Sequence, residues 1–185
     1  LNLGSTIVQD DTPKMFRIGN LHIAFAGSYW MYTHFKAMFF GLEDKNNSET
    51  LLKFLFGKSC YCETPSTEYI YSQCLVPLVL GHGKVKMKTE EIEMGLHVIW
   101  DIMVTCLKQR HLENHTQNPE DNSYGCQLAI VCRHGAYEVT SEGNVIRKNL
   151  VIIGSGTNFV QGAAFALTNS IDSAEVDAKI SGYSN

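Results

Sequence analysis

The order in which strand-like and helix-like stretches follow one another constrains the fold of this chain more than any single motif does. Apolar runs at 14–18 and 21–26 flank the turn dipeptide Gly19-Asn20, the pattern of a β-hairpin. Later strand patterns occupy 126–133, 136–140, 145–149 and 150–156. Amphipathic or alanine-rich helical patterns occupy 29–42, 89–111, 158–169 and 174–180. Because helices come in consecutive pairs between runs of strands, the sequence predicts an α+β fold with antiparallel sheets and helical layers outside them.

Residues 43–88 interrupt this order with a less regular stretch. "LEDKNNSET" reads as a polar loop, "LLKFLFG" as a short apolar helix, and "GHGKVKMKT" as a turn followed by an edge strand. A chain of 185 residues is within the usual size of one domain. We therefore interpret 1–185 as a single domain with an insertion at about 43–88.

Composition and charge exclude several classes of partner. The net charge is −4, and Lys and Arg are scattered without a basic stripe, which argues against nucleic acid or an anionic membrane surface. No stretch approaches the roughly 20 uninterrupted apolar residues of a membrane helix. The first residues, "LNLGSTIVQDD", lack the pattern of a secretory signal. We expect a cytoplasmic protein whose partners are proteins or peptides.

The six cysteines indicate a reducing compartment rather than a disulfide framework, because most of them lie inside apolar runs. Cys60 and Cys62, with Cys74 and His82 further along, raise the alternative of a zinc site. Their spacing is Cys-x-Cys rather than the gap of two to four residues that zinc sites use. The sequence therefore predicts free thiols, with no metal and no cofactor.

The turn Gly154-Ser155-Gly156 joins an apolar strand pattern to a helix rich in small residues. A phosphate loop would place backbone N–H groups at such a junction, but the Gly-Lys-Ser/Thr sequence is absent. A nucleophile elbow requires Gly-x-Ser-x-Gly, and this turn is one position too short. Taken alone, the two glycines are typical of a sharp turn that lets a helix approach a sheet closely.

Three stretches taken together resemble a known family. These are "DDTPKMFRIGNLHIAFAGS" (10–28), the helical pattern that follows it, and "LAIVCRHGAYEVTSEGNVIRKNLVIIGSGTNFVQGAAFAL" (128–167). In this order they resemble the proteasome β-type fold of N-terminal nucleophile hydrolases, and within it the bacterial proteasome-like threonine peptidases. The resemblance implies a four-layer αββα sandwich of antiparallel sheets, here without the family's first hairpin and last strand. It also implies self-association into a large assembly, with an unfolding ATPase as a further partner.

The resemblance also implies roles for three residues. Lys14 matches the lysine that activates the family's N-terminal threonine, whose own α-amino group serves as base. Gly27 matches the backbone N–H of the oxyanion hole, and Ser155 matches the serine beside the threonine amine. The nucleophile itself is not found in these positions. Ser5 and Thr6 follow a glycine as a self-cleavage junction would require, but they lie too near Lys14 to leave room for the missing hairpin.

Two functions follow from the resemblance. The chain is either the bulk of an N-terminal threonine endopeptidase whose nucleophile lies outside these residues, or a non-catalytic structural subunit of a larger assembly. Tyr29 and Trp30 favour the second, because they stand where the family has small residues and an aspartate, and would crowd the site. The insertion at 43–88 favours it too. An unrelated α+β binding module is the third alternative.

Overall fold

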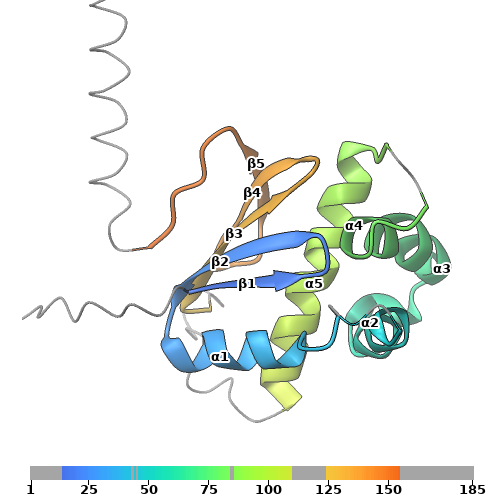
Figure 1. The fold of residues 1–185 in the computed structure, drawn as a ribbon, viewed down its shortest axis with the longest axis horizontal. Coiled ribbons are helices and arrows are strands. Elements are labelled where there is room, and N and C mark those ends of the chain that lie inside the picture. The colour runs from blue at the N-terminus through green and yellow to red at the C-terminus, as the bar shows by residue number, and fades with distance from the viewer. Residues whose placement is uncertain (1–13, 43, 45, 84–85, 110–123, 155–185) are drawn as a thin grey trace, which may run out of the picture.

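The computed structural model describes residues 14–42, 44, 46–83, 86–109 and 124–154, and within them the chain has an α+β fold (Figure 1). One five-stranded sheet has the order β1-β2-β3-β4-β5, with every neighbouring pair antiparallel. Its strands are β1 (Met15–Ile18), β2 (Leu21–Gly27), β3 (Cys126–Cys132), β4 (Gly135–Val139) and β5 (Val145–Lys148). The helices are α1 (Tyr29–Met38), α2 (Ser48–Phe56), α3 (Thr67–Tyr69), α4 (Val76–Val79) and α5 (Thr89–Gln109), with a 3-10 turn η1 (Cys60–Glu63) and a π-helical stretch η2 (Ile70–Leu75).

The sheet buries one of its two faces, as the alternation in the sequence predicts. Over the first five residues of β2 and of β3 every second side chain is buried, and the residues between them are half-buried or exposed. The buried side chains join one hydrophobic core with α1, α2, α4 and α5. On the opposite face, which we call the open face, Met15, Val131 and Ile146 are 57%, 50% and 42% exposed. The described part of the chain thus contains one sheet with a helical layer on one face.

Helix α5 is the longest of the described elements and crosses behind the sheet (Figure 1). It begins with two acidic residues in its first turn, which favour the positive end of a helix. The predicted apolar face is buried as expected: Ile92, Leu96, Ile99, Met103 and Leu107. Helix α1 begins at Tyr29 as predicted but ends at Met38, four residues earlier than the pattern indicated.

The segment 43–88 is more helical than its sequence predicts. Between Cys60 and Val79 the chain passes almost continuously through η1, α3, η2 and α4, and its buried residues belong to the core. Gly95 of α5 permits this packing, because a Cβ there would lie 2.7 Å from Leu78 Cδ2 and 3.0 Å from the Cys74 carbonyl oxygen. Two carboxylates of α5 also hold the segment: Glu91 accepts a hydrogen bond from the Tyr69 hydroxyl (2.9 Å), and Asp101 accepts one from the Cys60 N–H (2.7 Å).

Two predicted strands are wrong where the structure describes them. Residues 86–88, the described part of the predicted edge strand, are not in a strand. The predicted turn before them agrees with the positive φ of Gly81 and Gly83, 72° and 88°. Residues 151–154 form no strand either. A strand needs a paired neighbour, and among the described strands β5 pairs only with β4. The predicted helices at 158–169 and 174–180 lie outside the described residues.

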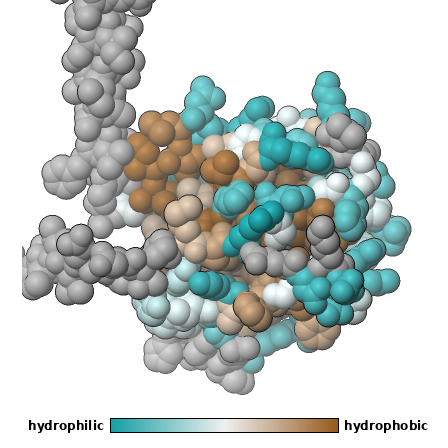
Figure 2. Space-filling model, in the orientation of Figure 1, coloured by the Kyte–Doolittle hydropathy of each residue, from teal (hydrophilic) through white to brown (hydrophobic). Residues whose placement is uncertain are grey.

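After β5 the chain instead turns back toward β2. At Gly154 a Cβ would lie 3.6 Å from the Cβ of Ala26, whose side chain is on the open face. Figure 2 shows brown, apolar surface gathered over this segment, where Leu150 is 60% exposed. Residues 149–154 therefore connect the β5 edge of the sheet with the end of β2.

Candidate functional site

Lys14 and Gly27, two of the three residues predicted for the site, are in contact. The Lys14 ammonium donates a hydrogen bond to the Gly27 carbonyl oxygen, with 3.0 Å between Nζ and O. The antiparallel hairpin brings them together, because Met15 is opposite Ala24 and the Phe25 N–H donates to the Lys14 carbonyl oxygen at 2.8 Å. The lysine is half-buried, and this hydrogen bond directs its charge to the backbone at the end of β2.

Gly27 occupies a position that only glycine fits. Its φ is 149°, and a Cβ would lie 2.8 Å from the Gly125 carbonyl oxygen and 2.9 Å from the Cβ of Cys126. Both contacts are well inside van der Waals distance, and the first is with backbone that cannot move aside. Because Gly27 has no side chain, it can contact a substrate only through its backbone groups. An oxyanion hole uses a backbone N–H in this way.

The third predicted residue, Ser155, lies outside the described residues, but its neighbour Gly154 is described. Gly154 approaches Ala26, the residue before Gly27, at the distance given above. Three segments far apart in the sequence, around residues 14, 27 and 154, thus meet at one end of the sheet. Ser5 and Thr6 also lie outside the described residues.

The first turn of α1 stands beside this end of the sheet. Tyr29 and Trp30 are 49% and 38% exposed. The Tyr29 ring contacts the Tyr32 ring at 5.9 Å between centroids, and the Tyr32 hydroxyl donates to the Met15 carbonyl oxygen at 2.9 Å. Tyr32 thereby ties α1 to the residue after Lys14. This supporting role of Tyr32 was not predicted from the sequence, although the spacing of three residues between Tyr29 and Tyr32 on one helix face is a signal for it.

Cys126 carries a thiol beside Gly27, since the two residues are opposite each other in the β2–β3 ladder. Burial raises the pKa of Cys126 to about 12. At neutral pH this side chain is a neutral thiol, whereas a cysteine nucleophile acts as a thiolate. The structure therefore argues against a cysteine hydrolase at this position.

The cysteines of the alternative zinc site do not form a ligand set. Cys60 is exposed, Cys74 is buried, and all six cysteines are free thiols. Within the described ranges, no three His, Cys, Asp or Glu side chains are grouped so that they could hold a metal ion. Among the described helices, none has both the length and the apolar character that crossing a bilayer demands.

Comparisons with protein-family models, curated proteins and solved structures gave no match to this chain. A fixed cation, a glycine backbone held in one conformation and an approaching glycine turn can together stabilise negative charge as it develops on a bound carbonyl oxygen.

Proposed function

We propose that this protein is a proteasome-like subunit related to the threonine-type peptidases. The observation that carries the proposal is the 3.0 Å hydrogen bond between Lys14 and Gly27. These residues were assigned to the site from the sequence resemblance alone. Their contact, and the approach of Gly154 to Ala26, support the assignment because the resemblance requires all three segments to meet.

The open face of the sheet supports the finer architecture, a four-layer αββα sandwich. The helical layer and the sheet account for two layers. Met15, Val131 and Ile146 are exposed apolar side chains on different strands of the same face, a surface that a second sheet would cover. In the proposed fold this second sheet is the third layer, and a further helical layer lies outside it.

In the proposed reaction the nucleophile is the hydroxyl of an N-terminal threonine outside the described residues. Its oxygen forms a bond to the peptide carbonyl carbon while its proton passes to the α-amine. The Gly27 N–H stabilises the oxyanion, the Lys14 ammonium favours the alkoxide, and Ser155 orients the amine. The C–N bond then breaks as the amine returns the proton to the leaving nitrogen, and water hydrolyses the resulting ester.

The experiment that tests this proposal uses the native protein. Its N-terminus is determined by intact mass and N-terminal sequencing, and the protein is then treated with a peptide aldehyde and assayed on fluorogenic peptides. We expect an adduct on an N-terminal threonine and peptide hydrolysis that Lys14→Ala abolishes. Lys53→Ala, which removes an exposed lysine from α2, is the matched control and should retain full activity.

The second candidate function is a non-catalytic subunit of a larger assembly. It is favoured by Tyr29 and Trp30, whose large exposed rings stand directly after Gly27-Ser28. For this function we expect neither an adduct nor turnover, together with a native mass of several subunits. For both candidate functions, the peptidase and the non-catalytic subunit, the proposal includes self-association and an unfolding ATPase as a partner. A monomer without an exposed N-terminal Thr, Ser or Cys would contradict both.

A further inference from the structure

The open face of the sheet is an apolar surface that extends from one edge strand to the other. Val131 stands on the middle strand, and Met15 and Ile146 are large apolar side chains on the two edge strands. Small side chains on β2, β3 and β4 lie between them: Ala24, Ala129 and Ala136. A contiguous apolar area of this kind on a protein surface marks an interaction site.

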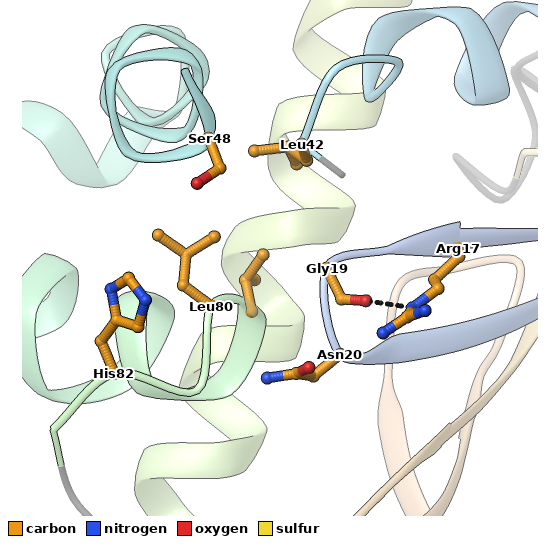
Figure 3. Close-up of a pocket in the computed structure, with 8 residues that line it drawn as sticks. Arg17, Gly19, Asn20, Leu42, Ser48, Leu80 and His82 are labelled. Carbon is orange, nitrogen blue, oxygen red and sulfur yellow. Dashed lines mark hydrogen bonds between the residues drawn. The ribbon is translucent and has the colours of Figure 1, made fainter. Parts of the chain in front are cut away.

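Charged side chains leave the centre of the open face apolar. The Arg17 side chain lies along the hairpin turn, where its Nε donates to the Gly19 carbonyl oxygen (Figure 3). Lys148, on the edge strand β5, forms an ion pair with Glu138. An apolar centre with charged groups at the margin is the composition of a protein–protein interface. The segment 149–154 does not cover this centre, since the three large apolar side chains of the face remain exposed.

The layout of the open face suits a second copy of the same face. Met15 on β1 and Ile146 on β5 belong to one row of side chains across the sheet, which passes through Ala24, Ala129 and Glu138. A two-fold axis along the middle strand β3 therefore brings Met15 of one copy against Ile146 of the other. The same axis aligns the strands of the two sheets, which is the arrangement of a β-sandwich.

The size of the open face is sufficient for a reversible dimer. Five strands of four to seven residues form it. At the usual strand spacing and rise per residue, the face measures about 24 Å by about 18 Å. Two such faces bury roughly 900 Å² in total, which is the area of a weak specific interface. We therefore expect a dissociation constant in the range of about 1–100 μM.

We propose that two copies of this protein pack their open faces together, so that each copy supplies the second sheet of the other. All five described strands belong to one sheet, and the helices of the described residues lie on its other face. The dimer then has the order helices, sheet, sheet, helices, which are the four layers of an αββα sandwich. The inference rests on the four-layer architecture proposed above, but it does not depend on peptidase activity.

The test is analytical ultracentrifugation of the full chain between about 1 and 300 μM. We expect an equilibrium between monomer and dimer. Val131→Lys should raise the dissociation constant at least about tenfold, because it places an unpaired charge in the interface. Val131→Thr is the milder variant and should raise it a few fold. Phe54→Lys, which replaces a 62% exposed side chain of α2, is the matched control and should associate as the wild type does. Circular dichroism establishes that each variant is folded.

Three results would overturn the proposal. The first is a monomer at every concentration, which would assign the open face to another segment of the chain or to a different protein. The second is an equal effect of Val131→Lys and Phe54→Lys. The third is a larger assembly whose stability Val131→Lys leaves unchanged, because its copies would then meet through another surface. The search for an adduct on an N-terminal threonine is a separate measurement, so a dimer without an adduct supports this inference and counts against the peptidase, and an adduct on a monomer does the reverse.

Discussion

Gly95→Ala sets two physical effects of opposite sign against each other in the middle of α5. Helix propensity alone predicts that alanine stabilises the protein by about 1 kcal/mol, because glycine is a poor helix former. The packing predicts the reverse. The added methyl carbon would lie 2.7 Å from Leu78 Cδ2 and 3.0 Å from the Cys74 carbonyl oxygen. Leu78 can rotate its end, but the Cys74 carbonyl belongs to the backbone of η2.

The packing term should be the larger one. Overpacking a buried contact costs about 1–3 kcal/mol, and here the neighbouring residues Leu75 and Leu78 are 0% and 2% exposed, so little space exists for relaxation. We expect a net loss of about 1 kcal/mol in the free energy of unfolding, or a Tm lower by about 2–4 °C. Gly95→Val adds two further carbons and should cost several kcal/mol.

Urea denaturation measures these losses directly. Gly125→Ala is the matched control, since a Cβ at Gly125 meets no atom within 4 Å, and it should change stability by less than about 0.5 kcal/mol. Combining Gly95→Ala with Leu78→Ala should cost less than the sum of the two separate losses, because the second change removes one of the colliding atoms. A Gly95→Ala variant as stable as the wild type, with an unchanged m-value, would refute the reasoning.

Two further predictions concern Gly27 and Cys60. Gly27→Ala should destabilise the protein by about 3 kcal/mol in the same denaturation assay, because it combines a strained φ with a backbone collision. Gly83→Ala is the control, because Gly83 also has a positive φ of 88° but a Cβ there would meet no atom within 4 Å. It should lower the free energy of unfolding by only about 1 kcal/mol. Equal losses in the two variants would contradict a collision between the methyl group added at position 27 and its neighbours. The pKa of the Cys60 thiol is raised to about 11. The largest cause is partial desolvation of the thiol, followed by its hydrogen bond to Asp101 and the negative charge of that carboxylate. Alkylation of Cys60 at pH 9, followed by peptide mapping, should therefore be slow and should accelerate in Asp101→Asn, since the pKa falls and more thiolate is present; an unchanged rate would argue against the Asp101 contact.

The parts of the fold that the sequence predicted are those in which local pattern and tertiary packing agree. The hairpin at 14–26 has a turn dipeptide and alternating side chains, and α5 has an unbroken apolar face. The contact between Lys14 and Gly27 follows almost directly. Once the turn is fixed at Gly19-Asn20, the antiparallel register brings the two ends of the hairpin together.

The errors arise where a local pattern lacks the tertiary partner that it needs. "VII" at 151–153 has strong β propensity, but no described strand lies beside it to pair with. The segment 60–79 contains Pro65 and several Ser and Thr residues, and its helices depend on contacts with α5 at Gly95, Glu91 and Asp101 that no local pattern reveals. The cavity beside the Gly19-Asn20 turn was missed for the same reason, since its lining residues Arg17, Ser48 and His82 come from β1, α2 and the loop after α4.

The pairing of β2 with β3 has a consequence for how the chain folds. Gly27 is opposite Cys126 and His22 is opposite Val131, so this central ladder joins residues about a hundred positions apart. Loop closure over such a distance is slow, and proteins dominated by distant pairings fold more slowly than helical ones. During synthesis the β1–β2 hairpin and helices α1 to α5 leave the ribosome before β3 exists. We therefore expect a helical cluster to form first, carrying a hairpin whose β2 edge waits for β3; the strands β3, β4 and β5 then complete the sheet.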